Sequence, residues 1–422
     1  MPVAENTYDV FANHFSPYCS GRHICSDQCH FFRLPSAIGI LIVSLLASLG
    51  LLGLDALWPS LHLTAELQRM VVAFDFSDAL LEEMLGLLLF AGALHVKFSD
   101  LKAHWGIVML MATMGVCLST LVAGIGFSWI TGAPLLIALV FGALISPTDP
   151  VAVLGVLRAA KLPKSLETKI AGESLFNDGV GYVVFLVLVG LAFPGAGAHG
   201  ASFGDAALLF FREAFGGAVL GLALGWGTYR VMCEINDYSV EVLLTLALAF
   251  GGYQLALWLH VSAPIMAVCA GLLIGDEMTA HAMTQKTRDY VDAFWKLLDE
   301  ILNAILFLMI GLEVFAIAFS IGAITAGLLA IGLSLLARWC AVIVPIMVLR
   351  PFRDFSQGIV PIMTWGGLKG GISVALALSL PESEFKPLIL TVTYIVVLFS
   401  IIVQGLTVAP MARRVSDNPD PR

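Results

Sequence analysis

Apolar runs of about 20 residues follow one another along most of this chain, with short polar segments between them. An α-helix of about 20 apolar residues spans the roughly 30 Å hydrocarbon core of a bilayer. The pattern therefore predicts an all-α polytopic membrane protein with about 12 transmembrane helices. Their predicted bounds are 35–54, 79–96, 105–130, 134–157, 170–193, 208–232, 241–259, 261–275, 298–318, 321–349, 358–380 and 387–409.

Polarity divides the chain into three parts. Residues 1–32 are polar and are expected to form a disordered N-terminal tail; their cysteines, spaced C-x5-C-x3-C, fit no standard zinc pattern. Residues 33–410 form the predicted transmembrane domain, and residues 411–422 a short cytoplasmic C-terminal tail. Within the domain, residues 278–300 have the pattern of an amphipathic helix that lies in the membrane interface.

Composition agrees with a membrane environment. The 422 residues are 59% hydrophobic and 13% charged, whereas soluble domains carry about 25% charged residues. The bilayer is thus the expected partner, and a nucleic-acid partner is not expected. Four of the seven cysteines fall inside apolar runs, where a buried thiol is ordinary, so no disulfide framework is predicted.

Basic residues indicate how the chain is oriented. With the N-terminus in the cytoplasm, seventeen basic residues fall on the inside and three on the outside, which is the asymmetry that the positive-inside rule expects. The inside set is Arg22, Arg33, Lys97, Lys102, Arg158, Lys161, Lys164, Lys169, Arg230, Lys286, Arg288, Lys296, Arg350, Arg353, Arg413, Arg414 and Arg422, against Arg69, Arg212 and Lys386 outside. Both termini are therefore expected to be cytoplasmic.

Two basic residues, Arg338 and Lys369, fall deep inside predicted spans, and three acids lie at similar depth: Asp149, Glu173 and Asp178. Charges at this depth are rare, and they usually face the interior of a helix bundle or an aqueous cavity, paired with another group. Opposite charges are thus available for pairing within the membrane.

The run FGALISPTDPVAVLGVL, residues 141–157, places Thr148 and Asp149 between two prolines. Proline removes a helical N–H and clashes with the preceding turn, so we expect the helix to break there. Broken backbone at membrane depth is tolerated where it lines a cavity or is buried, and its free carbonyls can coordinate cations. A simple proline kink beside a solvated aspartate is the alternative.

The run from Ile170 to Phe193 opens with the stretch GESLFND. At about 100° per residue, Glu173, Ser174, Asn177 and Asp178 lie within an arc of about 140° on one helix face. Carboxylate, hydroxyl and amide oxygens are the ligands that hard cations prefer. Hydrogen bonding between packed helices is the alternative use of these groups.

The run MTWGGLKGGISVALALSL, residues 363–380, has four glycines around Lys369. They weaken the helix in mid-span, as the prolines do near Asp149. Spans interrupted by Gly or Pro at corresponding places in two halves point to a transporter built from inverted repeats. The alternative for Lys369 is a lysine that snorkels to the interface.

These motifs resemble the electroneutral sodium/proton antiporters, the NhaP/NHE branch of the monovalent cation:proton antiporter superfamily. The resemblance covers about residues 33 to 410 and rests on SPTDP, GESLFNDGVG, GGLKGG, RLPSAIG, FAGALHV, SAPIMAVCAGLLIG and LDEILNAILFLMIGLEV. It implies inverted repeats of six spans, two broken helices that cross in mid-membrane, and a homodimer. The family has thirteen spans, so the twelve predicted here correspond to the family's set without the first.

The resemblance also implies roles for individual residues. Asp178 is the expected carrier of cation and proton. Its site would be completed by Thr148, Asp149 and Ser174. Electrogenic relatives have an aspartate where this chain has Asn177, which implies the exchange of one cation for one proton. The remaining charges are expected to be structural: Glu173 would pair with Arg338, and Lys369 stands where the family usually has arginine, which keeps the charge but loses bidentate geometry.

Together these features predict a secondary active antiporter in the plasma or inner membrane that exchanges Na⁺, or also Li⁺ or K⁺, for H⁺ without a cofactor. Proton and cation would compete for Asp178. A cation channel or another solute carrier on a related fold is the alternative. An enzyme is not expected: an intramembrane aspartyl protease could use Asp149 and Asp178, but its usual GxGD element is absent.

Overall fold

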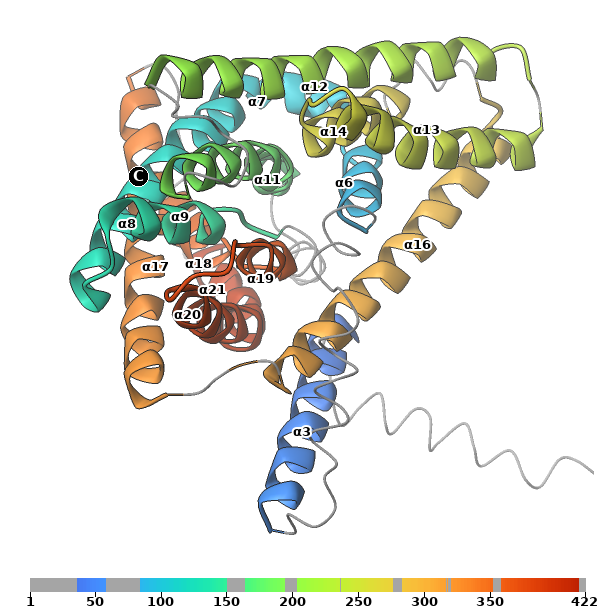
Figure 1. The fold of residues 1–422 in the computed structure, drawn as a ribbon. Coiled ribbons are helices and arrows are strands. Elements are labelled where there is room, and N and C mark those ends of the chain that lie inside the picture. The colour runs from blue at the N-terminus through green and yellow to red at the C-terminus, as the bar shows by residue number, and fades with distance from the viewer. Residues whose placement is uncertain are drawn as a thin grey trace, which may run out of the picture.

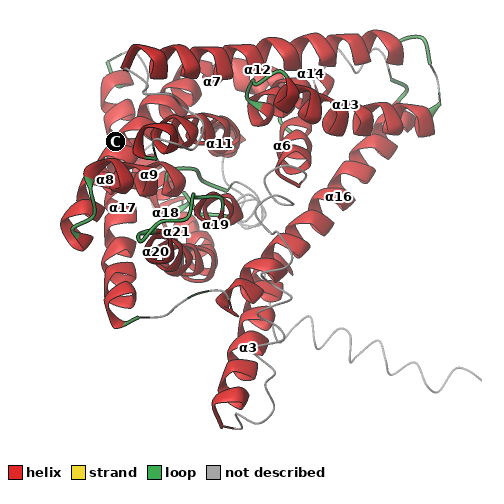
Figure 2. Cartoon of the chain, viewed as in Figure 1, coloured by secondary structure: helices red, strands yellow, loops and turns green. Residues whose placement is uncertain are grey.

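The computed structural model describes residues 36–57, 84–149, 164–193, 203–235, 237–275, 283–315, 317, 320–351 and 358–416. These residues form helices joined by loops, and no strand occurs among them (Figure 2). The predicted N-terminal tail of residues 1–32 lies outside the described residues.

The helices are numbered as in Figure 1. In chain order they are α3 (Ser36–Leu57), α6 (Leu85–Leu94), α7 (Phe98–Leu110), the π-helix η3 (Met111–Gly115), α8 (Val116–Thr131), α9 (Leu135–Ile145), α11 (Lys164–Ala192), α12 (Phe203–Met232), α13 (Tyr238–Trp258), α14 (Ala263–Gly275), α16 (Gln285–Leu312), the 3-10 helix η4 (Glu313–Phe315), α17 (Ile321–Leu349), α18 (Ile359–Trp365), α19 (Gly371–Leu378), α20 (Lys386–Phe399), the π-helix η5 (Ser400–Gln404) and α21 (Gly405–Ser416).

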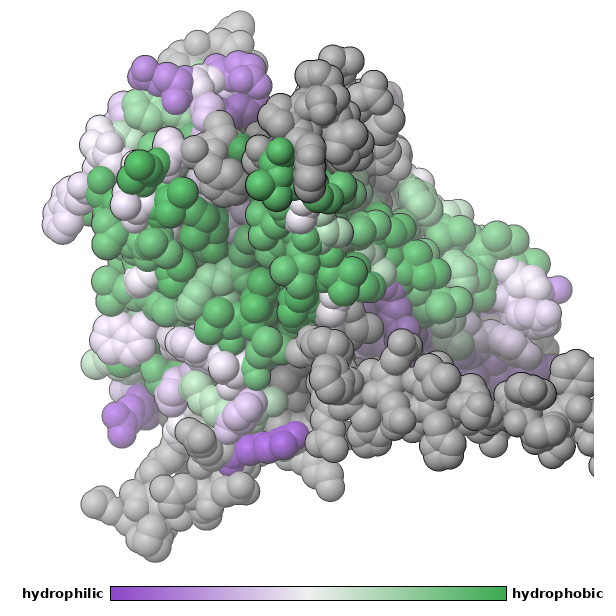
Figure 3. All heavy atoms as spheres, turned by 90° about the horizontal axis from the view of Figure 1, so that it is seen from below, coloured by the Kyte–Doolittle hydropathy of each residue, from purple (hydrophilic) through white to green (hydrophobic). Residues whose placement is uncertain are grey.

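Among the described residues, seven helical stretches are long and apolar enough, by length and composition, to cross a membrane. Three shorter apolar helices, α6, α9 and α14, add to them. In the space-filling view of Figure 3 the hydrophobic surface forms a band across the molecule, and hydrophilic groups gather above and below it. Large apolar side chains such as Phe211, Phe215 and Trp226 of α12 are exposed on the surface. The chain is thus a multi-pass membrane protein.

The helices gather in two groups that lie side by side (Figure 1). In one group α8 packs against α9 and α17, α11 packs against α9, and α19 and α17 pack against α20. In the other, α14 packs against α6, α12 and α13, and α16 packs against α3. Helix α11 also contacts α12 and α14, so it lies at the boundary between the two groups.

Most predicted spans coincide with helices. The span 321–349 has the bounds of α17, which begins where Ser320 Oγ accepts a hydrogen bond from Ala323 N at 3.1 Å. The span 105–130 belongs to a longer continuous stretch, Phe98–Thr131, that includes the π-helix η3. Residues 170–192 of the span 170–193 lie in α11, which begins six residues earlier, at Lys164, and ends at Ala192.

Two helices extend beyond the bounds of their predicted spans. Residues 285–300 of the predicted interfacial helix continue directly into the span predicted at 298–318, because α16 is one helix from Gln285 to Leu312. Its sequence has no proline and no glycine before Gly311, so nothing interrupts its hydrogen bonds. The last helix also continues beyond the predicted end of the span at 409, to Ser416.

Both predicted helix breaks are present in the fold. The helix of the first broken span ends at Ile145, just before Pro147, and residues 150–157 of that span lie outside the described residues. The second broken span consists of α18, which ends at Trp365, and α19, which begins at Gly371. The chain between them carries Lys369.

Candidate functional site

The two helix breaks are in direct contact. Asp149 N donates a hydrogen bond to Leu368 O at 2.8 Å, which joins the first break to the second. Gly370 permits this approach, since a Cβ at that position would lie 2.6 Å from Asp149 Cβ. An alanine there would overlap the aspartate. The crossing therefore brings Asp149 and Lys369 together from segments about 220 residues apart in the sequence.

Helix α11 is bonded to the first break by its polar face. Asn177 Nδ2 donates to Thr148 Oγ1 at 2.8 Å, and Asn177 Oδ1 accepts from Thr148 N at 3.3 Å. Thr148 Oγ1 also lies 3.0 Å from Ser174 Oγ. Gly181 permits the close approach, because a Cβ there would lie 2.6 Å from Pro147 Cγ. Thr148, Ser174 and Asn177 thus form one buried, hydrogen-bonded cluster.

Asp178 lies on the same face and is only 4% exposed. Its Oδ1 atom has no hydrogen-bond partner among the described residues, although almost all buried polar atoms in proteins have one. Its charged neighbours are Asp149 and Lys369, so it faces the crossing of the two breaks. A buried carboxylate oxygen that no protein group satisfies is available to a proton or a cation.

Glu173 has the opposite surroundings. Arg338 of α17 binds both of its carboxylate oxygens, with Nη1 on Oε1 and with Nη2 on Oε2 at 2.9 Å. Arg338 Nε also donates to Met363 O of α18 at 3.2 Å. The side chains of this ion pair are almost fully buried. Arg338 thus connects α11, α17 and α18.

Lys369 does not form a close ion pair with any of the acids that the structure describes around it. Its Nζ atom donates instead to two carbonyls, Ser146 O at 3.0 Å and Pro147 O at 3.4 Å. These carbonyls follow the end of α9, where the helix leaves carbonyls without intrahelical partners and carries partial negative charge. A single ammonium group suits this role, so the loss of bidentate arginine geometry does not disturb the contact.

Sequence reasoning missed two polar residues beside the second break, Ser400 and Gln404, which are buried in η5. Ser400 Oγ accepts a hydrogen bond from Lys369 N at 2.8 Å. Gln404 Nε2 donates to Trp365 O at 3.0 Å. The available signal was a serine and a glutamine four residues apart inside the last apolar run.

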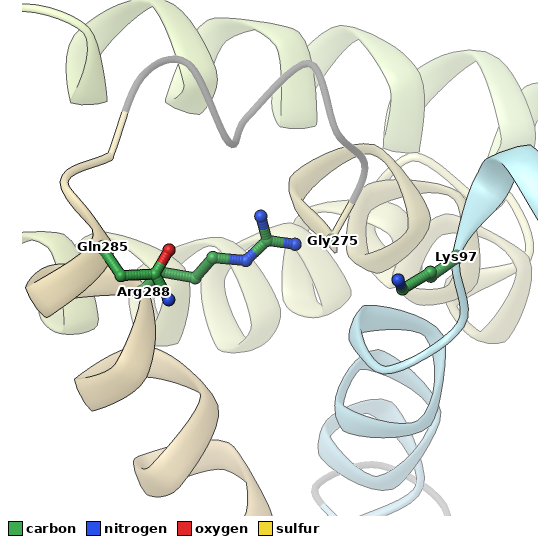
Figure 4. A pocket seen from close by; sticks show the side chains of 4 residues that line it. All are labelled: Lys97, Gly275, Gln285 and Arg288. Carbon is green, nitrogen blue, oxygen red and sulfur yellow. The ribbon is translucent and has the colours of Figure 1, made fainter.

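A pocket away from the crossing has different chemistry. It holds about 190 Å³ and is lined by Lys97, Gly275, Gln285 and Arg288. Figure 4 shows Lys97 and Arg288 extending toward the pocket from opposite sides. Two cationic side chains oppose the entry of a cation, so this pocket is not the candidate cation site. Within the described part of the chain, no three His, Cys, Asp or Glu side chains gather to hold a resident metal ion.

Known proteins share both the sequence and the fold. The family model for the transmembrane sodium/hydrogen exchanger matches residues 23–414. The chain is 47% identical over 396 residues to the Na(+)/H(+) antiporter NhaP of Pseudomonas aeruginosa, which covers 91% of this chain and 92% of that protein. It is 32% identical over 384 residues to the Na(+)/H(+) antiporter NhaH of Halobacillus dabanensis, covering 90% and 92%.

A solved structure has the same arrangement of helices. The sodium proton antiporter MjNhaP1 of Methanocaldococcus jannaschii, determined at pH 8, superposes with a TM-score of 0.74. The match covers 93% of this chain and 95% of that one at 18% sequence identity. It bears out the predicted fold class.

Proposed function

Since the chain belongs to the sodium/hydrogen exchanger family, we propose that it is a secondary active antiporter that exchanges Na⁺ for H⁺ at Asp178. One observation carries the assignment of the site. Asp178 is buried where the two helix breaks cross, and its Oδ1 atom has no partner. The neighbouring side chains of Glu173, Asn177 and Lys369 are bonded to the protein, whereas this carboxylate oxygen is left for the transported ion.

The surrounding residues complete the site in this proposal. Asp149 supplies a second carboxylate from the first break, and Thr148 and Ser174 supply hydroxyl oxygens. Asn177 holds Thr148 in place by two hydrogen bonds. Oxygen ligands of this kind replace the hydration shell of a hard monovalent cation, so Li⁺ and K⁺ are further candidate substrates.

Three other charged residues maintain the geometry. Glu173 and Arg338 hold α11 against α17 and α18. Lys369 binds the carbonyls of Ser146 and Pro147, directly before Thr148. Neither Glu173 nor Lys369 is assigned to carry the transported ion.

Exchange follows from competition at one carboxylate. A proton bound to Asp178 neutralises it and removes its attraction for a cation, and a bound cation favours the ionised form that excludes the proton. Either ligand neutralises the site, whereas moving a bare charge through hydrocarbon costs about 3 kcal/mol or more. The empty, ionised site therefore does not switch from one side of the membrane to the other. An inward proton gradient then drives the cation out.

One proton exchanged for one monovalent cation makes the transport electroneutral. The proposal needs neither a cofactor nor an enzymatic reaction, because the driving force is the ion gradient. We place the protein in the plasma or inner membrane as a homodimer with a cytoplasmic C-terminus, as its basic residues and the resemblance to its family suggest. A cation channel is not favoured, since the curated relatives are named as antiporters.

Purified protein in proteoliposomes tests the proposal directly. With a pH-sensitive dye inside, added Na⁺ should dissipate a preformed pH gradient for the wild type. Asp178→Asn keeps the size of the side chain but removes the exchangeable charge, so we expect pH-dependent exchange to be lost. Glu382→Gln is the matched control, because Glu382 is exposed and pairs with Lys386, four residues further along the chain. Full exchange by Asp178→Asn would contradict the proposal.

A further inference from the structure

The π-helix η5 directs two buried side chains toward the second helix break. Ser400 is 1% exposed and Gln404 is 3% exposed. A π-helix inserts an extra residue into a helix, and such bulges are frequent at functional sites. The role proposed above for Asp178 and Lys369 uses neither residue.

The hydrogen bonds of this pair form a closed clamp across the break. Ser400 Oγ accepts from Lys369 N at 2.8 Å and donates to Gln404 Oε1 at 2.6 Å. Gln404 Nε2 donates to Trp365 O at 3.0 Å. Trp365 ends α18, and Lys369 lies just before α19, so the clamp binds both sides of the interruption. Only the NH2 group of the amide can donate to a carbonyl, which fixes the orientation of Gln404.

The clamp matters because the break itself is flexible. Gly366, Gly367 and Gly370 surround Lys369, and glycine restricts its own backbone least of all residues. The position of Lys369 must therefore come from contacts with other elements. Its backbone is held by Ser400, and its ammonium group is held by the carbonyls at the end of α9.

We propose that Gln404 is a positioning residue for the cation site, acting through Ser400 and the backbone of Lys369. From Lys369 the contact continues to Ser146 O and Pro147 O, which precede Thr148 in the chain. Gln404 does not touch the transported ion. Its loss displaces the first break and with it the oxygens that surround Asp178, so it weakens cation binding. This inference rests on the proposed function.

Two substitutions separate positioning from simple packing. Gln404→Met keeps the length and approximate volume of the side chain but removes both hydrogen bonds. Gln404→Glu keeps the acceptor for Ser400, yet it can donate to Trp365 O only when its carboxyl group is protonated. A packing role predicts that the methionine variant, which keeps the volume of the side chain, also keeps the wild-type KM. The clamp predicts that the glutamate variant works better at acidic pH than at alkaline pH, relative to the wild type.

The experiment measures the apparent KM for Na⁺ of purified protein in proteoliposomes from pH 6 to pH 9. We expect Gln404→Met to raise the KM about tenfold at every pH, since a lost buried hydrogen bond is worth about that factor. Gln404→Glu should raise it less at pH 6 than at pH 9. Ser400→Ala, which removes the acceptor for Lys369 N, should raise the KM for Na⁺ as well. It replaces a Gln404 variant as the test if that variant does not fold. Gln285→Met makes the same change at an exposed residue and should keep the wild-type KM.

Two results would overturn the inference: a wild-type KM in Gln404→Met, or equal shifts in the methionine and glutamate variants at both ends of the pH range. The wild type measured in parallel keeps the two hypotheses apart. If the wild type does not exchange Na⁺ for H⁺, the proposed function fails. If the wild type exchanges and the Gln404 variants match it, only the positioning role fails.

Discussion

Two carboxylates five residues apart on α11 have opposite surroundings, and this difference divides their roles. Both oxygens of Glu173 are bound by Arg338, whereas Oδ1 of Asp178 has no partner in the part of the chain that the structure describes. A carboxylate whose oxygens are already bound by a guanidinium is a poor ligand for an ion that must bind and leave. The geometry thus separates a structural acid from the candidate carrier on one helix face.

The buried pair gives a prediction about stability. Glu173→Gln leaves the Arg338 guanidinium buried without its counter-charge, and removing one partner of a buried ion pair costs about 3–5 kcal/mol. We expect a clear fall in the melting temperature of the detergent-purified protein. The double variant Glu173→Gln, Arg338→Met should recover part of the loss, because it leaves no unpaired charge. A single variant as stable as the wild type would show that the pair does not stabilise the fold.

At this scale the sequence predicted a helix face but not all the partners of its residues. Helical spacing places Glu173, Ser174, Asn177 and Asp178 on one face because the period of an α-helix is fixed. The contact between Lys369 and the carbonyls after α9 could not be read in the same way, since backbone carbonyls have no sequence signature. Gln404 was missed for a related reason: its partner in the break is the carbonyl of Trp365.

Among the elements, the second broken helix depends on glycines for its close contacts. A Cβ added at Gly367 would overlap Arg338 Nε and would lie 2.9 Å from Cδ and Cζ. The end of an arginine can usually move, but here it is held by Glu173 and by Met363 O. The glycine therefore allows the ion pair and the helix break to occupy adjacent space.

We expect Gly367→Ala to lower both the thermal stability and the exchange rate, because Arg338 must move out of its contact with Glu173. Gly332→Ala is the matched control. Gly332 lies on α17, the helix of Arg338, and nothing is within 4 Å of a Cβ added there. The comparison uses melting temperature and Na⁺-driven proton flux for both variants. Equal behaviour of the two alanine variants would show that the close approach at Gly367 is not required.

Helix breaks were easier to predict than helix continuity. Pro147 and the glycines around Lys369 act through their own backbone, so the sequence alone locates the interruptions. Helix α16 differs because its first half is polar and its second half is apolar, which suggested two elements. Backbone hydrogen bonds do not depend on that change of polarity, and the helix continues through it.

On the scale of the whole molecule, α11 lies between the two groups of helices that Figure 1 shows. Its polar face meets the crossing of the two breaks, and it also contacts α12 and α14 of the other group. Movement of one group against the other would therefore change the side of the hydrophobic band of Figure 3 from which Asp178 is reached. Alternating access needs a movement of this kind around a fixed site.

A single carboxylate shared by proton and cation makes a quantitative prediction for the intact exchanger. As pH falls, more Asp178 is protonated and fewer sites can bind Na⁺, so the apparent KM for Na⁺ must rise. Where protonation dominates, one proton per site gives about a tenfold rise for each pH unit. The maximal rate at saturating Na⁺ should stay nearly constant, because enough cation displaces the proton. Proteoliposomes with equal pH on both sides and labelled Na⁺ exchange give both quantities. A maximal rate that falls at low pH while the KM stays constant would place the inhibiting proton on a group other than Asp178.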